Sequence, residues 1–262
     1  WVIDETIINT TYDTETKYWT CISTPVWQNG VQYQVKVWAI DTVNNTNKNT
    51  AEAGSVTFVY DATEPDSIVT AFSDTSYRSS LSTISGTAAD THTAVTQVEI
   101  SIKDLSALEY WRSNAWVSYS TWVAVSGTAN WTYSSIPTWV EGRSYAISSM
   151  AIDRANNYES IITTKTFTWD VSKPTTTMAA PVDNKYYRTL TTMSGTATDI
   201  LAGIQTSGVE ISIKENETNK WWGGFGFSES AEVWKTVTGE NAWTYAGFAG
   251  YLQSGRMYTV KS

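Results

Sequence analysis

Six aspartates stand at recurring places in this 262-residue chain, each just beyond a run of residues with strand-forming character. Carboxylate oxygens on loops are the ligands that hard cations prefer, and Ca²⁺ takes six to eight oxygens from such loops. Aspartate at a strand end also forms Asx turns and caps without any metal, so both interpretations stay open. The candidate ligands are Asp41, Asp61, Asp90, Asp153, Asp170 and Asp199.

Residues for proton transfer or nucleophilic attack are scarce. Histidine occurs once, as His92, so a Ser-His-Asp site would exist in one part of the chain only. The single cysteine, Cys21, aligns with tyrosines in the later repeats, which favours a packing role. No Gly-rich phosphate loop, zinc-ligand spacing or EF-hand loop occurs. We therefore expect no enzymatic activity and no cofactor except calcium.

The 14 tryptophans offer another kind of site, because an exposed aromatic face can stack on a sugar ring. Most of them recur at matching positions, as Trp131 and Trp243 do, and are expected to pack in cores or hinges. Trp38 and Trp116 have no tryptophan mate. Trp38 also falls on the polar face of its expected strand. These two are the candidates for carbohydrate or partner contact.

Composition narrows the partners and the fold class. The net charge is −9, and the 17 Lys and Arg are scattered, so the chain lacks the basic stripe that nucleic acids or anionic membranes require. There is no apolar run of about 18 residues and no leader-like segment, so we expect neither a membrane span nor a signal peptide. Abundant Thr, Trp and Tyr with little Leu favour strands over helices. We predict an all-β protein.

The elements that position these side chains follow from an internal repeat of about 110 residues. Three stretches recur at offsets of 109 to 111: 58–61 at 167–170, 84–88 at 193–197, and 98–103 at 209–214. The repeat predicts three parts: 1–62, the C-terminal part of a first unit; 63–171, a complete unit; and 172–262, a third unit lacking its last strands. We expect the chain to be a window on a longer tandem array.

Within a unit the strands show period-two alternation. Val98, Ile100 and Ile102 are expected to face inward, as are Tyr33 and Val35 of the first unit. Short strands separated by Gly, Asn, Asp and Pro, in a unit of this size, favour a two-sheet sandwich over a barrel. The short segments 61–65 and 170–174, which end in Pro, predict stiff hinges.

The motif Tyr-x-Val-x-Val-x-Ala-x-Asp-x-x-x-Asn at 33–45 has a variant at 145–157, and Phe-x-x-Asp-x-x-x-Pro follows each. This pattern resembles bacterial Ig-like repeats of large surface proteins and adhesins. The Trp-x-x-Gly-x-x-Tyr motif at 27–33 and 139–145 is similar to the tyrosine corner of Ig-like and fibronectin type III domains. The resemblance implies tandem Ig-like β-sandwiches, an extracellular or cell-surface location, and aspartates that gather at domain junctions to bind calcium.

The function expected from these features is mechanical: a structural or adhesive stalk, fibre or filament segment. Its partners would be neighbouring repeats, further copies of the chain through free strand edges, and a glycan or surface receptor. The alternative is a carbohydrate-binding module that uses exposed tryptophan, or an accessory domain of a hydrolase.

Overall fold

The computed structural model describes residues 11–13, 15–16, 18–21, 25–48 and 54–262. Apart from one 3-10 turn, η1 (Ala249–Tyr251), every regular element in this part of the chain is a β-strand. The strands in this part of the chain pair in antiparallel fashion, which confirms the predicted all-β, Ig-like class of sandwich. Across those ranges, no helix has the length and apolar character needed to cross a bilayer.

The chain forms two compact units, which are described separately. The first comprises Trp1–Thr75, Leu81–Thr138 and Tyr145–Phe167, and the second comprises Ser76–Ser80, Trp139–Ser144 and Thr168–Ser262. The repeat boundaries 1–62, 63–171 and 172–262 stay a prediction, and residues 1–10 of the first repeat lie outside the described residues.

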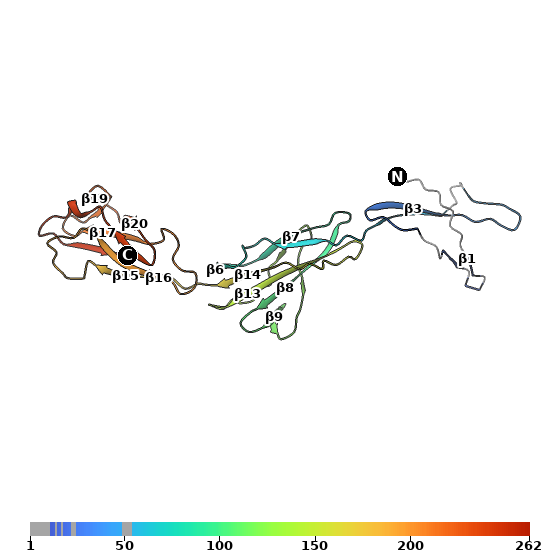
Figure 1. Ribbon diagram of the computed structural model, residues 1–262, viewed down its shortest axis with the longest axis horizontal. Helices are drawn as coiled ribbons and strands as arrows, with labels where there is room; N and C mark the ends of the chain where they lie inside the picture. The colour runs from blue at the N-terminus through green and yellow to red at the C-terminus, as the bar shows by residue number, and fades with distance from the viewer. Residues whose placement is uncertain (1–10, 14, 17, 22–24, 49–53) are drawn as a thin grey trace. The chain divides into compact units, whose positions relative to one another are not determined.

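Two antiparallel sheets build the sandwich in the first unit (Figure 1). One has the order β12-β7-β5, and the other contains β10-β9-β8-β13-β14, with β11 also paired to β8. Ile102 of β8 lies opposite Ile147 of β13, and both are fully buried. The predicted inward face of Val98, Ile100 and Ile102 is therefore confirmed. The strands are β5 (Asp66–Val69), β7 (Ile84–Ala89), β8 (Val95–Asp104), β9 (Glu109–Arg112), β10 (Ala115–Val117), β11 (Val123–Ala124), β12 (Asn130–Tyr133), β13 (Ser144–Asp153) and β14 (Thr164–Trp169). The strand β6 (Ser76–Arg78), between β5 and β7 in the chain, is assigned to the second unit.

The earlier strands form two small sheets. The strands β1 (Thr11–Tyr12) and β2 (Trp19–Thr20) pair with each other, and β3 (Val31–Val37) pairs with β4 (Gly54–Tyr60). Val35 is 40% exposed, so the alternation predicted for β3 does not bury it in the described part of the chain. The reason is that within the described residues this hairpin has no second sheet over it.

The second unit contains a sandwich of the same kind. Its sheets have the orders β15-β16-β21 and β19-β18-β17-β20, and β22 also pairs with β17. The core packs Trp243, Trp222 and Phe248 against the isoleucines of β17. The strands are β15 (Thr175–Ala180), β16 (Met193–Thr198), β17 (Glu210–Glu215), β18 (Lys220–Trp222), β19 (Phe227–Glu229), β20 (Trp234–Thr236), β21 (Ala242–Tyr245) and β22 (Tyr258–Lys261).

The repeated Ser-Gly-Thr-Ala motif has a packing explanation. Gly86 of β7 lies opposite Trp131 of β12, and a Cβ built on it would sit 2.1 Å from the indole ring. Gly195 and Trp243 repeat the arrangement with a distance of 2.4 Å. The tryptophan therefore packs directly on the backbone of the neighbouring strand, and only glycine leaves room for it. A tryptophan that recurs between repeats is not always buried, however. Trp234 recurs from Trp122 and is 42% exposed.

The tyrosine corner predicted at 27–33 is present, and a second one lies at Tyr258, whereas the corner at 139–145 stays a prediction. The Tyr33 hydroxyl accepts a hydrogen bond from the Gln28 amide at 2.7 Å, and the Tyr258 hydroxyl accepts one from the Gln253 amide at 2.9 Å. The intervening glycine has positive φ in each corner, +75° at Gly30 and +81° at Gly255. The corner fixes the loop that precedes each of the strands β3 and β22.

Candidate metal centre

Three of the six predicted aspartates lie together in the first unit. Asp61 follows β4, Asp90 follows β7, and Asp153 ends β13. One carboxylate oxygen from each lies within 4.8 Å of the other two. Asp61 and Asp153 are buried, 8% and 1% exposed, and Asp90 is half-buried. Three strand ends that are distant in the sequence thus supply one cluster.

Each carboxylate is held by its own loop. Asp90 Oδ1 accepts hydrogen bonds from the backbone amides of His92 at 2.8 Å and Thr93 at 2.7 Å. Asp61 Oδ1 accepts the Thr63 amide at 2.9 Å. These bonds are Asx turns, the metal-free role that the sequence left open, and each uses only one oxygen of its carboxylate.

Asp153 is held at both oxygens by a single residue. Its Oδ1 accepts the backbone amide of Asn157 at 2.9 Å, and its Oδ2 accepts the side-chain amide of the same residue at 2.8 Å. Asn157 also donates to the main-chain carbonyl of Asp61 at 3.2 Å. Sequence reasoning did not assign Asn157 a role, although the repeated Asp-x-x-x-Asn spacing carries the signal.

Two oxygens of the cluster have no partner. Asp61 Oδ2 and Asp90 Oδ2 are inaccessible to solvent and make no hydrogen bond. Leaving a buried charged acceptor unpaired costs more than 1 kcal/mol, so such groups normally bind a proton, a water molecule or a cation. A hard cation that prefers oxygen ligands satisfies both atoms and the third carboxylate together. The donor set therefore fits calcium.

The charge at this site is uncompensated within the described ranges, where none of the three aspartates forms an ion pair with Lys, Arg or His. Burial raises the pKa of Asp90, but hydrogen bonds from the backbone amides of Thr93, His92 and Thr91 outweigh it, so the pKa is lowered overall. Asp90 therefore stays ionised at neutral pH and contributes a full negative charge to the cluster.

The remaining aspartates repeat parts of this arrangement. Asp170 Oδ2 and Asp199 Oδ1 both accept the amide of Ala202, at 3.0 and 2.9 Å. The Ser172 hydroxyl, with that amide, lowers the pKa of Asp170 against the opposing effect of burial. Asp41 binds Asn45 through the same two bonds by which Asp153 binds Asn157, in an exposed loop after β3. A calcium site at these three residues stays a prediction.

The hinge segments are held by residues that the sequence analysis missed. Asn29 Oδ1 accepts the amide of Ala62 at 2.7 Å, and its side-chain nitrogen donates to Thr63 at 2.6 Å. In the second unit, Glu141 accepts the amide of Val171 at 2.8 Å. Asn29 and Glu141 each come directly before the glycine of a Trp-x-x-Gly-x-x-Tyr stretch. The amide after each hinge aspartate is therefore fixed by a corner loop.

The two candidate carbohydrate-binding tryptophans are half-buried. Lys48 Nζ lies 5.0 Å from the centre of the Trp38 ring. Trp116 lies between Trp111 and Tyr145, with ring centroids 5.4 and 6.0 Å away. A role of either ring in binding sugar stays a prediction.

His92 lies in the exposed loop after Asp90, and its ring covers Gly30. Cys21 is a half-buried free thiol.

Neither a protein-family model nor a characterised protein matches the sequence. Among solved structures, the chain is similar to a segment of two fibronectin type III domains from chicken tenascin. The two share 11% sequence identity with a TM-score of 0.26, over 76% of this chain and 99% of the tenascin segment.

Proposed function

We propose that this chain is a non-enzymatic structural or adhesive segment of a long cell-surface repeat protein, in which calcium bound by Asp61, Asp90 and Asp153 stiffens the junction between repeats. The observation that carries the proposal is the pair of buried, unpartnered carboxylate oxygens in a cluster of three acidic residues. Calcium sites in extracellular modules have dissociation constants of about 0.1 to 1 mM, which suits a chain outside the cell.

A cation at this point would act mechanically. Asp61 belongs to the hinge segment, whereas Asp90 and Asp153 belong to the sandwich that follows it. Without metal, one polar link between them is the bond from Asn157 to the Asp61 carbonyl. Bound calcium would add bonds from all three carboxylates and remove their mutual repulsion, so pulling the hinge away would require breaking several strong contacts together.

The rest of the proposed role draws on the sequence. A single histidine in an exposed loop supports the non-enzymatic part of the proposal. The resemblance of the repeats to bacterial Ig-like surface proteins supports an adhesive or stalk role. The expected partners are further copies of the chain, which would assemble into filaments, and a glycan or surface receptor.

The test is thermal and urea unfolding of the whole chain with 5 mM calcium and with excess chelator. We expect calcium to raise the free energy of unfolding, by about 2.7 kcal/mol at a hundredfold excess over the dissociation constant. The Asp61→Asn variant keeps the Oδ1 acceptor for Thr63 but removes one charge. It should lose most of the calcium effect.

In chelator, Asp61→Asn should instead stabilise the chain. Relief of repulsion among the acidic groups raises the free energy of unfolding by about 1 kcal/mol. Asp13→Asn is the matched control, because Asp13 Oδ1 accepts backbone amides in an Asx turn and lies outside the cluster. It should respond to calcium as the unaltered chain does. Equal stability of the unaltered chain in calcium and chelator would refute the metal site.

A further inference from the structure

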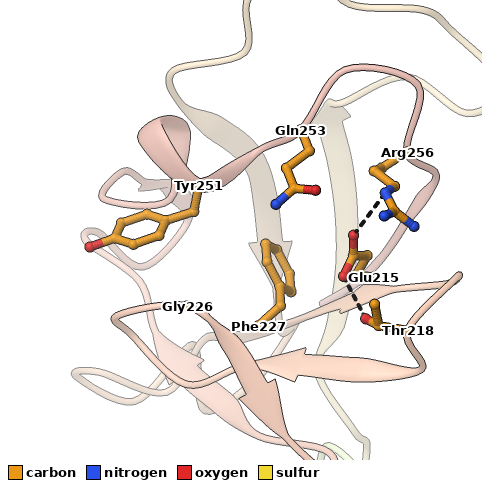
Figure 2. Close-up of a pocket in the computed structure, with 7 residues that line it drawn as sticks. All are labelled: Glu215, Thr218, Gly226, Phe227, Tyr251, Gln253 and Arg256. Atoms are coloured by element: carbon orange, nitrogen blue, oxygen red, sulfur yellow. Dashed lines mark hydrogen bonds and ion pairs between the residues drawn. The ribbon is translucent and has the colours of Figure 1, made fainter.

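A hollow of about 380 Å³ opens in the second unit (Figure 2). One wall is the segment from η1 to the start of β22, which carries Tyr251, Gln253 and Arg256. The facing wall comes from the end of β17 and the strands that follow, with Glu215 and Phe227. Its size falls within the range of small-molecule sites, about 300 to 1,000 Å³.

The polar side of the hollow has balanced charge. Glu215 is only 6% exposed, and its Oε1 lies 3.5 Å from Arg256 Nε. The Thr218 hydroxyl donates to the other oxygen of this carboxylate. A carboxylate and a guanidinium side by side present both acceptors and donors, with no net charge to attract an ion.

Gln253 completes the polar set. Figure 2 shows its side-chain amide directed into the hollow, toward the Phe227 ring. Its backbone amide is the donor to the Tyr258 hydroxyl, so the tyrosine corner holds this residue in place while the side chain stays available. An amide offers a donor and an acceptor side by side, which can pair with two neighbouring hydroxyl groups.

The aromatic side is rigid. Phe227 packs against Trp222 and Tyr258, with ring centroids 5.4 and 5.1 Å away. Tyr251 packs against Trp222 at 4.8 Å. Because Trp222 is fully buried, these contacts anchor both rings to the core of the sandwich. Phe227 presents apolar surface beside the polar groups, and its packing reduces the entropic cost of ordering on binding.

The corresponding positions of the preceding repeat keep the charged pair and change the rest. Offsets of 111 and 113 residues relate Glu215 to Asp104 and Arg256 to Arg143. By the same offsets, the preceding repeat has Val140 at the position of Gln253, Thr138 at that of Tyr251, and Trp116 at that of Phe227. The acid, the base and an aromatic ring at the position of Phe227 belong to the common sandwich, whereas Gln253 and Tyr251 are particular to this unit.

We propose that this hollow binds a neutral saccharide ring. The Gln253 amide and the Glu215–Arg256 pair would exchange hydrogen bonds with ring hydroxyls, and Phe227 would contact the apolar C–H face of the sugar. A neutral sugar is favoured over an ionic ligand because the charges within the hollow already compensate each other. With one open side and few polar groups, the dissociation constant is expected in the range of about 1 mM.

The experiment is saturation-transfer NMR on the whole chain, in calcium, with the methyl glycosides of glucose, galactose, mannose and N-acetylglucosamine at 20 mM. We expect transfer to at least one glycoside, and a loss of at least fivefold in Gln253→Val, which introduces the residue of the preceding repeat. Gln28→Val is the matched control, because Gln28 is the exposed equivalent of Gln253 in the first tyrosine corner. It should leave the transfer unchanged.

Three results would overturn the proposal. One is no transfer to any of the four glycosides from a chain whose unfolding midpoint is normal. Another is transfer that survives both Gln253→Val and Phe227→Leu, which would locate sugar binding elsewhere. Binding of glucuronate or inorganic phosphate in place of the neutral glycosides would likewise reject a neutral ligand. None of these results depends on the aspartate cluster, so the calcium proposal stands or falls separately.

Discussion

The side-chain amide of Asn157 donates a hydrogen bond of 3.2 Å to the main-chain carbonyl of Asp61, a residue 96 positions earlier in the chain. The same nitrogen lies 2.8 Å from Asp153 Oδ2. One amide therefore joins the hinge segment to the loop after β13 and orients a carboxylate of the acidic cluster. The arrangement is a cross-link built from an ordinary Asx turn.

Replacing Asn157 by alanine should weaken both functions of that cross-link. We expect Asn157→Ala to lower the free energy of unfolding by about 1 to 3 kcal/mol in chelator and to reduce calcium affinity, because Asp153 loses the group that orients it. Asn45→Ala removes the same two bonds within the loop of Asp41 and spares the hinge. A calcium titration monitored by unfolding midpoint compares them, and equal effects of the two variants would contradict a role for the hinge bond.

Gly195→Ala should be among the most damaging substitutions in the second unit. The new Cβ would lie 2.0 Å from the Thr177 carbonyl and 2.4 Å from the Trp243 ring, so two strands must separate. We expect a loss of about 3 kcal/mol or more, measured by urea unfolding. Gly250→Ala is the control, because nothing lies within 4 Å of its Cβ position and its φ is not positive. Its stability should change by less than about 1 kcal/mol.

Two corner glycines separate backbone strain from contact between side chains. Gly30 and Gly142 have nearly equal φ, +75° and +74°, so alanine is strained at both. Only the Cβ at Gly30 would meet another group, the ring of His92, at 2.6 Å. Because the chain has one histidine, its imidazole C–H resonance is directly assignable. We expect Gly30→Ala to shift that resonance and Gly142→Ala to leave it in place, and identical spectra for both would disprove the contact.

Asp74 should make stability depend on pH in acid. The backbone amide of Thr166, followed by its hydroxyl, lowers the pKa of Asp74 by hydrogen bonding to the charged carboxylate. A lowered folded-state pKa means that this stabilisation is complete above the unfolded value of about 3.9 and is lost as the pH falls through the folded value. The stability difference between the unaltered chain and Asp74→Asn should therefore be largest at pH 5 and shrink toward pH 2.5. Urea midpoints across that range test it, and a constant difference would contradict the assignment.

Local rules were enough to predict most of the fold. The alternation of Val98, Ile100 and Ile102 specifies a half-buried strand whatever surrounds it, because side chains on a strand point to opposite faces in turn. The tyrosine corner is equally local, since the glycine and the tyrosine that define it lie three residues apart. At Val35, burial depended on a second sheet. The alternation assigned Val35 to the apolar face of its strand, but it could not predict whether another sheet covers that face.

The candidate site divides along the same line. The sequence identified Asp61, Asp90 and Asp153 as oxygen donors at strand ends, and it placed Asn157 in the repeated Asp-x-x-x-Asn motif without assigning it a role. Which of the six aspartates meet, and which of their oxygens are left unpartnered, depends on the packing of β4, β7 and β13, whose ends are 29 and 64 residues apart in sequence. Strand order and sheet packing are set by contacts between residues that are distant in the sequence. The spacing of residues along the chain does not reveal these contacts. The hollow around Gln253 was decided in the same way, because its two walls come from segments that only the folded sandwich brings face to face.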